Sequence, residues 1–495
     1  MIFKNLATFI AAAFALIEYV NADNATTSST ASYDPRTYST YEPSATDIAQ
    51  LASNSTSLQW TTNVEGKAFN RFMVIWLENT DYDKAADNDD LNWLAEQGIT
   101  LTNYWALTHP SEPNYMASVG GDYFSLNDDR FISLPKNVST IADLLDEGGI
   151  SWAEYQEDIP FSGFQGFNYS NQVTFANDYV RKHNPLMLYE SVTSNSTRLS
   201  LIKNQTEFTK DLEEQKLPQY MIWTPNMLND GHDTTIKYAG NWTRTFLEPL
   251  LENEYFMNDT LILLTFDENE NYGMQNTVFS VLLGGVIPDE LKGTNDDTFY
   301  DHYSQIATVE ANWDLYCLGR NDVDANIFSL VAEAAGISNK EVDTTYKLNN
   351  DTYVGYLLDD QLDLPAPNVS AVNMNGKGVL PTIVDTWKST FEEQVSASYF
   401  TPTTTTVSIG GVTNAVTLAT VSFKQANSSA YINSTTATNT RGANATASSS
   451  QYVSATSGAN ESSTIGSASK SANGGNVINT SLSALLLGLV NALFF

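Results

Sequence analysis

The stretch Leu261-Ile262-Leu263-Leu264-Thr265-Phe266-Asp267-Glu268 decides the fold class, because an almost unbroken apolar run leads directly into two carboxylates. Short continuous runs of this kind are typical of strands buried on both faces of a parallel sheet. Comparable runs occupy residues 72–77, 220–223 and 278–283, and candidate helices occupy residues 140–147 and 242–255. This alternation predicts an α/β fold with a doubly wound, mostly parallel sheet flanked by helices.

Polar and acidic residues directly follow three of these strand-like runs. Glu78-Asn79 follow the run at 72–77, residues 224–233 follow the next, and Asp267-Glu268 end the stretch quoted above. Doubly wound sheets bind ligands at the carboxyl ends of their strands, and oxygen ligands suit Mg²⁺, Ca²⁺ or Mn²⁺. The pattern predicts a cation site at one sheet edge, with ordinary loop polarity in a very acidic protein as the alternative.

The four histidines of the chain all lie in apparent turns, next to Pro, Asn, Asp, Gly or Ser. They are His109, His183, His232 and His302. None occupies the core-facing position of an amphipathic helix, and four of four in turns favours ligands or proton donors over histidines that are simply exposed in loops.

A helix is predicted to begin near Ser111, because Pro113 suits a first turn and Gly120-Gly121 suit a helix stop. The free amides and the dipole at a helix N-terminus favour an anion. A hydroxyl there, beside a metal ion, is a candidate nucleophile for phosphoryl transfer. A plain serine N-cap fits the same residues.

Six ordered motifs between about residues 69 and 340 resemble those of the fungal acid phosphatase branch of the phosphoesterase family. They are Leu77-Glu78-Asn79, His109-Pro110-Ser111-x-Pro-Asn114-Tyr115, Lys182-His183-Asn184-Pro185, Asn226-x-x-Asn229-Asp230-x-His232-Asp233, Thr265-x-Asp267-Glu268 and His302-Tyr303-Ser304. The family also includes bacterial acid phosphatases and phosphatidylcholine-type phospholipases C. The Ser-x-Pro-Asn turn is similar to that of nucleotide pyrophosphatases, which places the expected fold near the alkaline phosphatase superfamily.

The resemblance implies a divalent metal ion of unknown identity, held by Glu78, Asn79, Asp267 and Glu268. Ser111 would be the nucleophile and a further ligand. This lean ligand set implies one ion rather than a pair of zinc ions.

The resemblance also implies how the phosphate is bound, by the amides after Ser111 and by several side chains. Asn114 would donate to a phosphate oxygen, and His183 and His232 would be phosphate contacts or the leaving-group acid, with Asp230 orienting His232. His109 and His302 would lie farther from the substrate. The implied activity is an acid phosphatase acting on small phosphomonoesters through a phosphoserine. A phospholipase C-type phosphodiesterase and a non-catalytic wall glycoprotein of the same fold are the alternatives.

Both ends of the chain predict targeting segments. The apolar run at 6–17, followed by Val20-Asn21-Ala22, indicates a secretory signal peptide over residues 1–22, with an N-terminal membrane anchor as the alternative. The apolar tail over 482–495 indicates a GPI-attachment signal over 476–495, with a transmembrane helix as the alternative. Candidate attachment residues are Ser471, Asn473 and Gly474.

Between these ends we expect three regions. Residues 23–68 form a lead-in, residues 69–395 the catalytic domain, and residues 396–475 a disordered Ser/Thr-rich glycosylated stalk, within which 404–423 allow a short strand pair. Sequons for N-linked glycans include Asn54, Asn137, Asn168, Asn195, Asn204, Asn241, Asn258, Asn350, Asn368 and Asn427.

The composition of the chain restricts the classes of molecule that it could bind. A formal charge of −34 argues against nucleic acid and anionic lipid, so a membrane would be contacted through the anchor only. The single cysteine, Cys317, cannot form an intrachain disulfide and is predicted to be a buried small hydrophobe. The expected location is extracellular, at the cell surface.

Overall fold

The computed structural model describes residues 42–345, 347–350, 353, 355–358, 362–397, 399–409, 412–424 and 431–439. The expected signal peptide (1–22), the GPI signal (476–495), the first part of the lead-in (23–41) and the end of the stalk (440–475) lie outside these ranges. Within the described residues, no helix has both the length and the apolarity needed to cross a bilayer.

The strands are β1 (Arg71–Leu77), β2 (Ile99–Leu101), β3 (Tyr104–Trp105), β4 (Trp152–Gln156), β5 (Asn168–Ser170), β6 (Asn177–Val180), β7 (Ile202–Asn204), β8 (Tyr220–Thr224), β9 (Thr260–Phe266), β10 (Ser280–Leu283), β11 (Thr294–Asp296), β12 (Tyr300–Asp301), β13 (Tyr399–Ile409), β14 (Val412–Lys424) and β15 (Tyr431–Asn439). The α-helices are α2 (Ala45–Ala52), α3 (Tyr82–Ala86), α4 (Asp89–Ala95), α5 (Ser111–Gly120), α6 (Ile141–Glu147), α7 (Glu190–Thr193), α8 (Ser196–Leu199), α9 (Gln205–Glu213), α10 (Ile236–Leu251), α11 (Glu254–Met257), α12 (Tyr303–Trp313), α13 (Ser329–Ala335) and α14 (Pro381–Ala397). Short 3₁₀ helices are η1 (Arg181–His183), η2 (Pro185–Leu188), η3 (Asp289–Leu291) and η4 (Asn321–Asp324).

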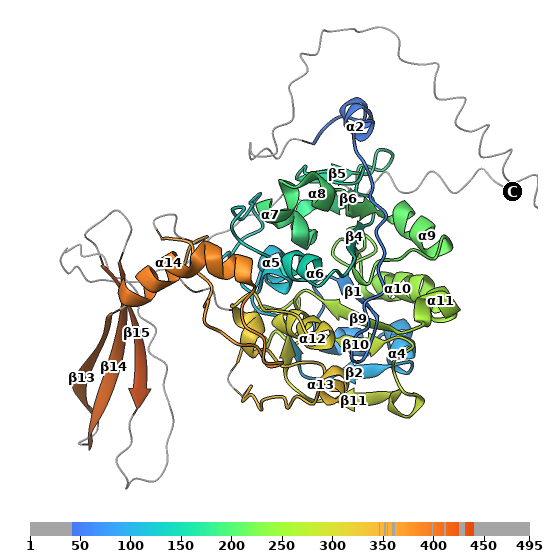
Figure 1. Cartoon of the computed structure of the whole chain (residues 1–495). Coiled ribbons are helices and arrows are strands. Elements are labelled where there is room, and N and C mark those ends of the chain that lie inside the picture. Colours follow the sequence, from blue (N-terminus) through green and yellow to red (C-terminus); the bar gives the residue numbers. More distant parts are fainter. Residues whose placement is uncertain are drawn as a thin grey trace, which may run out of the picture.

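A mixed sheet of eight strands forms the centre, in the order β11-β2-β10-β9-β1-β8-β4-β7. β1 lies between β8 and β9 and is parallel to both. β10 is antiparallel to β9 and β2, so the run at 278–283 is a strand of opposite direction. Helices cover both faces, with α4, α9, α10 and α11 on one side and α5, α6, α12 and α13 on the other (Figure 1). The predicted mostly parallel α/β sheet is confirmed.

The apolar runs are buried on both faces, as their sequence indicates. All residues of β1 after Arg71, and all of β9, are buried. Each fully buried large apolar side chain stabilises the fold by about 1.5–3 kcal/mol relative to exposure. Cys317 is also buried, as predicted, and burial raises the pKa of its thiol.

Helix boundaries follow the capping residues. Thr140 caps α6 at the predicted place, and its side chain accepts the Ala142 amide. The helix predicted over 242–255 instead begins at Ile236 and ends at Leu251, because Thr235 caps its start. Asn253 then caps the separate helix α11 by accepting the Phe256 amide.

The chain beyond the catalytic domain contains more strand than the sequence indicated. α14 leads into β13, β14 and β15, which form a three-stranded antiparallel sheet. The sequence predicted at most a short strand pair over 404–423.

A buried carboxyl group in β4 makes the stability of the fold depend on pH. The Glu154 carboxyl is fully buried and accepts hydrogen bonds from Gln156 Nε2 (2.7 Å) and the Leu186 amide (3.2 Å). Burial raises its pKa from 4.5 to about 8. Between these values the unfolded chain releases a proton that the folded chain retains, so stability is full below pH 4.5 and is lost as the pH rises toward 8.

We therefore expect Glu154→Gln to stabilise the protein against urea by about 2–4 kcal/mol at pH 8 and by little at pH 4. The matched control is Glu252→Gln, at an exposed carboxyl that follows α10. Equal stability differences between Glu154→Gln and the wild type at both pH values would contradict this prediction.

Candidate active site

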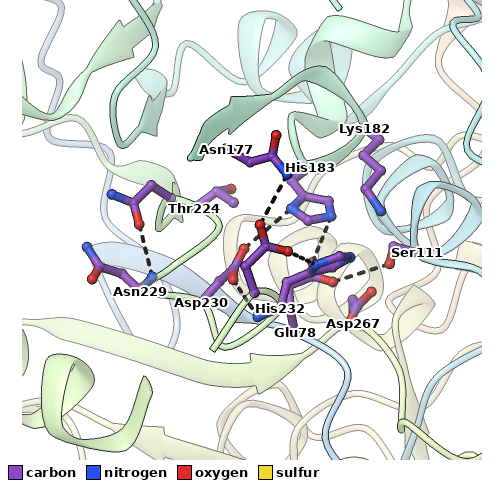
Figure 2. A network of polar contacts seen from close by, with 12 residues as sticks. Glu78, Ser111, Asn177, Lys182, His183, Thr224, Asn229, Asp230, His232 and Asp267 are labelled. Atoms are coloured by element: carbon purple, nitrogen blue, oxygen red, sulfur yellow. Dashed lines mark hydrogen bonds and ion pairs between the residues drawn. The ribbon is translucent and has the colours of Figure 1, made fainter. Parts of the chain in front are cut away.

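The carboxyl ends of β1, β8 and β9 meet at one edge of the sheet, as the strand pattern predicts. The Glu78 amide donates to the Asp230 carbonyl (2.9 Å), and the Asp267 amide donates to the Leu77 carbonyl (3.0 Å). The Asn79 amide donates to Asp267 Oδ1 (3.1 Å), and Asn79 has a left-handed backbone with φ of 44°. Three distant stretches of chain thus supply buried carboxylates to one place (Figure 2).

Ser111 is the first residue of α5, which ends at Gly120 and is capped by Gly121 in the left-handed conformation that glycine favours. Both predicted boundaries are confirmed. The buried Ser111 Oγ donates to Glu78 Oε2 (3.2 Å) and lies 3.5 Å from Glu268 Oε1. The hydroxyl and the carboxylates therefore lie within reach of one bound ion, whose bonds to oxygen measure roughly 2–2.6 Å.

The second oxygen of Glu78 faces a different set of groups. Glu78 Oε1 accepts the Tyr115 hydroxyl and lies 3.3 Å from His183 Nε2. His183 Nδ1 lies 3.5 Å from Asp230 Oδ2. Glu78, His183 and Asp230 offer ligand atoms within 4.8 Å of one another and could hold a metal ion. This group shares only Glu78 with the predicted ligand set, so Asn79, Asp267, Glu268 and Ser111 stay predicted ligands.

The chemistry of these residues fits a cation. Burial raises the pKa of Glu78 well above its usual value, and Asp267 and Asp230 raise it further. Burial and the Asp267 charge likewise raise the pKa of Glu268. Several buried atoms have no hydrogen-bond partner among the described residues, namely Asn79 Oδ1, Asp230 Oδ2, Asp267 Oδ2 and both ring nitrogens of His183. Clustered carboxylates that repel one another and leave lone pairs unused are what a bound cation would satisfy.

Asn114 lies at the site, but its amide group mainly holds the turn before α5. Asn114 Oδ1 accepts the amides of Leu107 (2.9 Å) and Thr108 (3.3 Å). Asn114 Nδ2 donates to the Thr108 carbonyl (2.8 Å) and to Glu268 Oε2 (3.3 Å). Its contact with phosphate stays a prediction.

The amides after Ser111 are less available than the sequence suggested. The Glu112 amide donates to Asp129 Oδ1 (3.0 Å), and Pro113 has no amide hydrogen. The first two positions after the candidate nucleophile therefore offer no free donor to an anion.

The histidines divide into two pairs. His183 is buried against Tyr115, and its ring lies 5.8 Å from that of His232. His232 Nδ1 lies 2.8 Å from Asp233 Oδ1, while Asp230 Oδ1 accepts only the backbone amide of His232 (2.8 Å). Asp233, rather than Asp230, therefore orients the His232 ring, because the ring nitrogen contacts the adjacent carboxylate.

His109 and His302 contact the segment that follows β9, and their distance from a substrate stays a prediction. His109 contacts Asn269 and Asn350 through its two ring nitrogens and stacks on Tyr272. His302 Nε2 donates to the Asp267 carbonyl (2.6 Å), and burial lowers the pKa of His302 to about 4. A neutral His302 thus positions the backbone of Asp267.

Three further residues of the site were not assigned from the sequence. Tyr115 donates to Glu78, and Lys182 Nζ binds Asp129 Oδ2 at 2.9 Å. Tyr115 and Lys182 stand inside the quoted motifs, next to assigned residues, so their position was a usable indication. Asp129 lies in a loop between α5 and α6 that contains no motif.

Comparisons with known proteins identify the family of this chain. A model described as the Phosphoesterase family matches residues 23–316. A probable acid phosphatase of Kluyveromyces lactis is 65% identical over 78% of this chain and 91% of its own length. An acid phosphatase of Aspergillus fumigatus is 60% identical over 63% of this chain and 70% of its own length. A phosphate-repressible acid phosphatase of Penicillium chrysogenum is 53% identical over 65% of this chain and 78% of its own length.

Likeness to solved structures is weaker. The phosphonate monoester hydrolase of Agrobacterium radiobacter is 13% identical, with a TM-score of 0.37, over 55% of this chain and 78% of that one. A likeness of this size does not bear on function. The matched family model and the long, highly identical relatives instead show that this chain belongs to the phosphoesterase family, among relatives named as fungal acid phosphatases.

Proposed function

We propose that this acid phosphatase hydrolyses small phosphate monoesters with Ser111 as the nucleophile and a phosphoserine as the intermediate. The observation that carries the proposal is the buried Ser111 hydroxyl at the start of α5, 3.2 Å from Glu78 Oε2. A hydroxyl in that place can attack phosphorus while a carboxylate takes its proton.

Glu78 and Asp267 are the central ligands in the proposal, with Asn79, Glu268 and Ser111 completing the set. A bound divalent cation would supply positive charge that favours the alkoxide of Ser111 and offsets the charge of the phosphate. The hydrogen bond from Ser111 to Glu78 sets the direction in which the serine proton leaves.

Proton donation to the leaving group is assigned to His232 rather than to His183. Burial, with Lys182 and His232 nearby, lowers the pKa of His183 well below its usual value, so His183 is neutral and carries no proton to donate to the leaving group. The His232 side chain is 27% exposed, and Asp233 binds its Nδ1, which leaves Nε2 for the leaving oxygen. Water then attacks the phosphoserine, with His232 acting as the base.

The test is a single-turnover experiment with ³²P-labelled substrate, quenched in acid. We expect label on Ser111, and hydrolysis of p-nitrophenyl phosphate that a chelator abolishes. If the enzyme hydrolyses bis-p-nitrophenyl phosphate faster than p-nitrophenyl phosphate, the proposed monoesterase activity is wrong and a phosphodiesterase activity takes its place. No labelled serine would end the proposed mechanism.

His232→Asn is expected to distinguish substrates by their leaving groups. An alkyl phosphate needs its leaving oxygen protonated, whereas p-nitrophenolate leaves without help, so kcat should fall about 10²–10³-fold for the alkyl ester and much less for p-nitrophenyl phosphate. An equal fall in kcat for both substrates would show that His232 is not the acid that protonates the leaving group. Thr234→Ala is the control, since its hydroxyl donates to the Leu228 carbonyl (2.6 Å) in the same loop.

We also propose that the chain is secreted, N-glycosylated and held at the cell surface by a GPI anchor. Exposed sequon asparagines support the glycans, namely Asn54, Asn137, Asn195, Asn241, Asn258 and Asn368. Asn350 is a poorer acceptor, because its amide binds His109 and the Tyr272 carbonyl. Release of activity from cells by a phosphatidylinositol-specific phospholipase tests the anchor, and persistent cell association after treatment contradicts it.

A further inference from the structure

The first two residues after Ser111 supply no free amide to the phosphate group of a substrate. The Glu112 amide is already bound to Asp129, and Pro113 has no amide hydrogen. Free amides at a helix start are the usual cradle for an anion. Side-chain donors can replace the two that are missing here.

Lys182 is placed to supply such a donor. It lies in η1, and its side chain points toward the part of the site that holds Ser111 and Asp267 (Figure 2). The ammonium therefore lies on the same side of the site as the proposed nucleophile.

The ion pair of Lys182 differs from a structural ion pair elsewhere in the chain. The charged groups of Lys203 and Asp211 lie 2.9 Å apart, and their side chains are 1% and 0% exposed. The Tyr155 hydroxyl also donates a hydrogen bond to Asp211 Oδ2. Lys182 and Asp129 are also 2.9 Å apart, but their side chains are 16% and 29% exposed. A ligand from solvent can therefore reach the second pair and not the first.

Asp129 links the ammonium to the nucleophile helix. Its Oδ2 binds Lys182 Nζ and its Oδ1 accepts the Glu112 amide, one residue after Ser111. One carboxylate thus fixes the ammonium relative to the start of α5.

We propose that Lys182 is a substrate-binding residue that contacts the non-bridging phosphate oxygens, and that Asp129 is its positioning residue. This inference rests on the proposed function, because it assigns a residue to the same phosphate site. In a chain of net charge −34, this ammonium offsets the local negative field that would otherwise repel the substrate.

The experiment compares Lys182→Met, Lys182→Arg and the control Lys216→Met in the full-length enzyme. Lys216 is an exposed lysine paired with Glu214 at 3.1 Å, so the control removes the same charge away from the site. The readouts are KM and kcat for p-nitrophenyl phosphate, the inhibition constant of inorganic phosphate, and bound metal per chain. Loss of one charge-assisted hydrogen bond to phosphate should raise KM and the inhibition constant about 10- to 100-fold in Lys182→Met.

The expected pattern is a large rise in both constants for Lys182→Met, partial rescue by Lys182→Arg, no change for Lys216→Met, and full metal content throughout. An unchanged phosphate inhibition constant in Lys182→Met would overturn the inference, as would loss of metal from that variant. If the wild type hydrolyses no phosphomonoester, the proposed function fails. Calorimetric titration with inorganic phosphate then tests Lys182 separately, and equal affinity in the wild type and Lys182→Met overturns the assignment.

Discussion

Ser111→Ala is expected to lower kcat for p-nitrophenyl phosphate by roughly 10⁴-fold or more while leaving the protein folded. The hydroxyl is the group that would bond to phosphorus, so no other atom of the site replaces it. The methyl group of alanine fits the same space at the start of α5. The hydrogen bond lost is the one to Glu78.

The matched control for this change lies on the same helix. Ser118 is also buried, and its Oγ donates to the Tyr115 carbonyl at 2.8 Å. Ser118→Ala should leave kcat within a few fold of the wild type. A Ser111→Ala enzyme that retains more than about 10% of wild-type kcat, with equal purity and metal content, would refute the assignment of Ser111.

Glu78→Gln is expected to have opposite effects on activity and on the stability of the metal-free protein. Glu78 is the carboxylate shared between Ser111 and the His183–Asp230 group, so the amide should abolish detectable turnover and metal binding. In the metal-free protein, the neutral glutamine replaces a buried carboxylate whose charge is disfavoured by burial and by repulsion from Asp267 and Asp230. The metal-free variant should therefore melt several degrees higher than the metal-free wild type.

The measurement is the melting temperature with and without a saturating divalent ion. The wild type should gain stability from the ion by mass action, and Glu78→Gln should gain none. Glu154→Gln removes another buried carboxyl and should keep both turnover and the metal-dependent shift. A metal-dependent shift of wild-type size in Glu78→Gln would exclude Glu78 as a ligand.

Much of the sheet and of its active edge could be predicted from local sequence. Buried runs such as 72–77 and 261–266 carry their strand character in their own composition, and parallel neighbours must end at the same edge. The direction of β10 could not be predicted, because an apolar run buried on both faces is the same read in either direction. The start of α10 was misplaced because Thr235, its cap, stands in a polar loop without hydrophobic periodicity.

The residues of the active site also divide into those that the sequence could predict and those that it could not. Glu78 and Asp267 directly follow strands and Ser111 begins a helix, so their meeting was predictable from the ends of those elements. The partners of Asn114 and the contact of Asp129 with the Glu112 amide were not, because they join loops whose paths depend on packing. Hydrogen bonds between distant loops leave no periodic trace in a sequence.

The sequence by itself determined that strands end in carboxylates, that a helix begins at a serine, and that the histidines stand in turns. These are local properties, set by burial pattern, capping and backbone preference. Only the tertiary structure decided that His183 faces Glu78 and Asp230, that Asp233 holds the His232 ring, and that Lys182 enters the site. Those side chains are placed by the packing of η1 and the loop after β8 against α5 and the sheet, and such long-range contacts are fixed only when the whole core assembles.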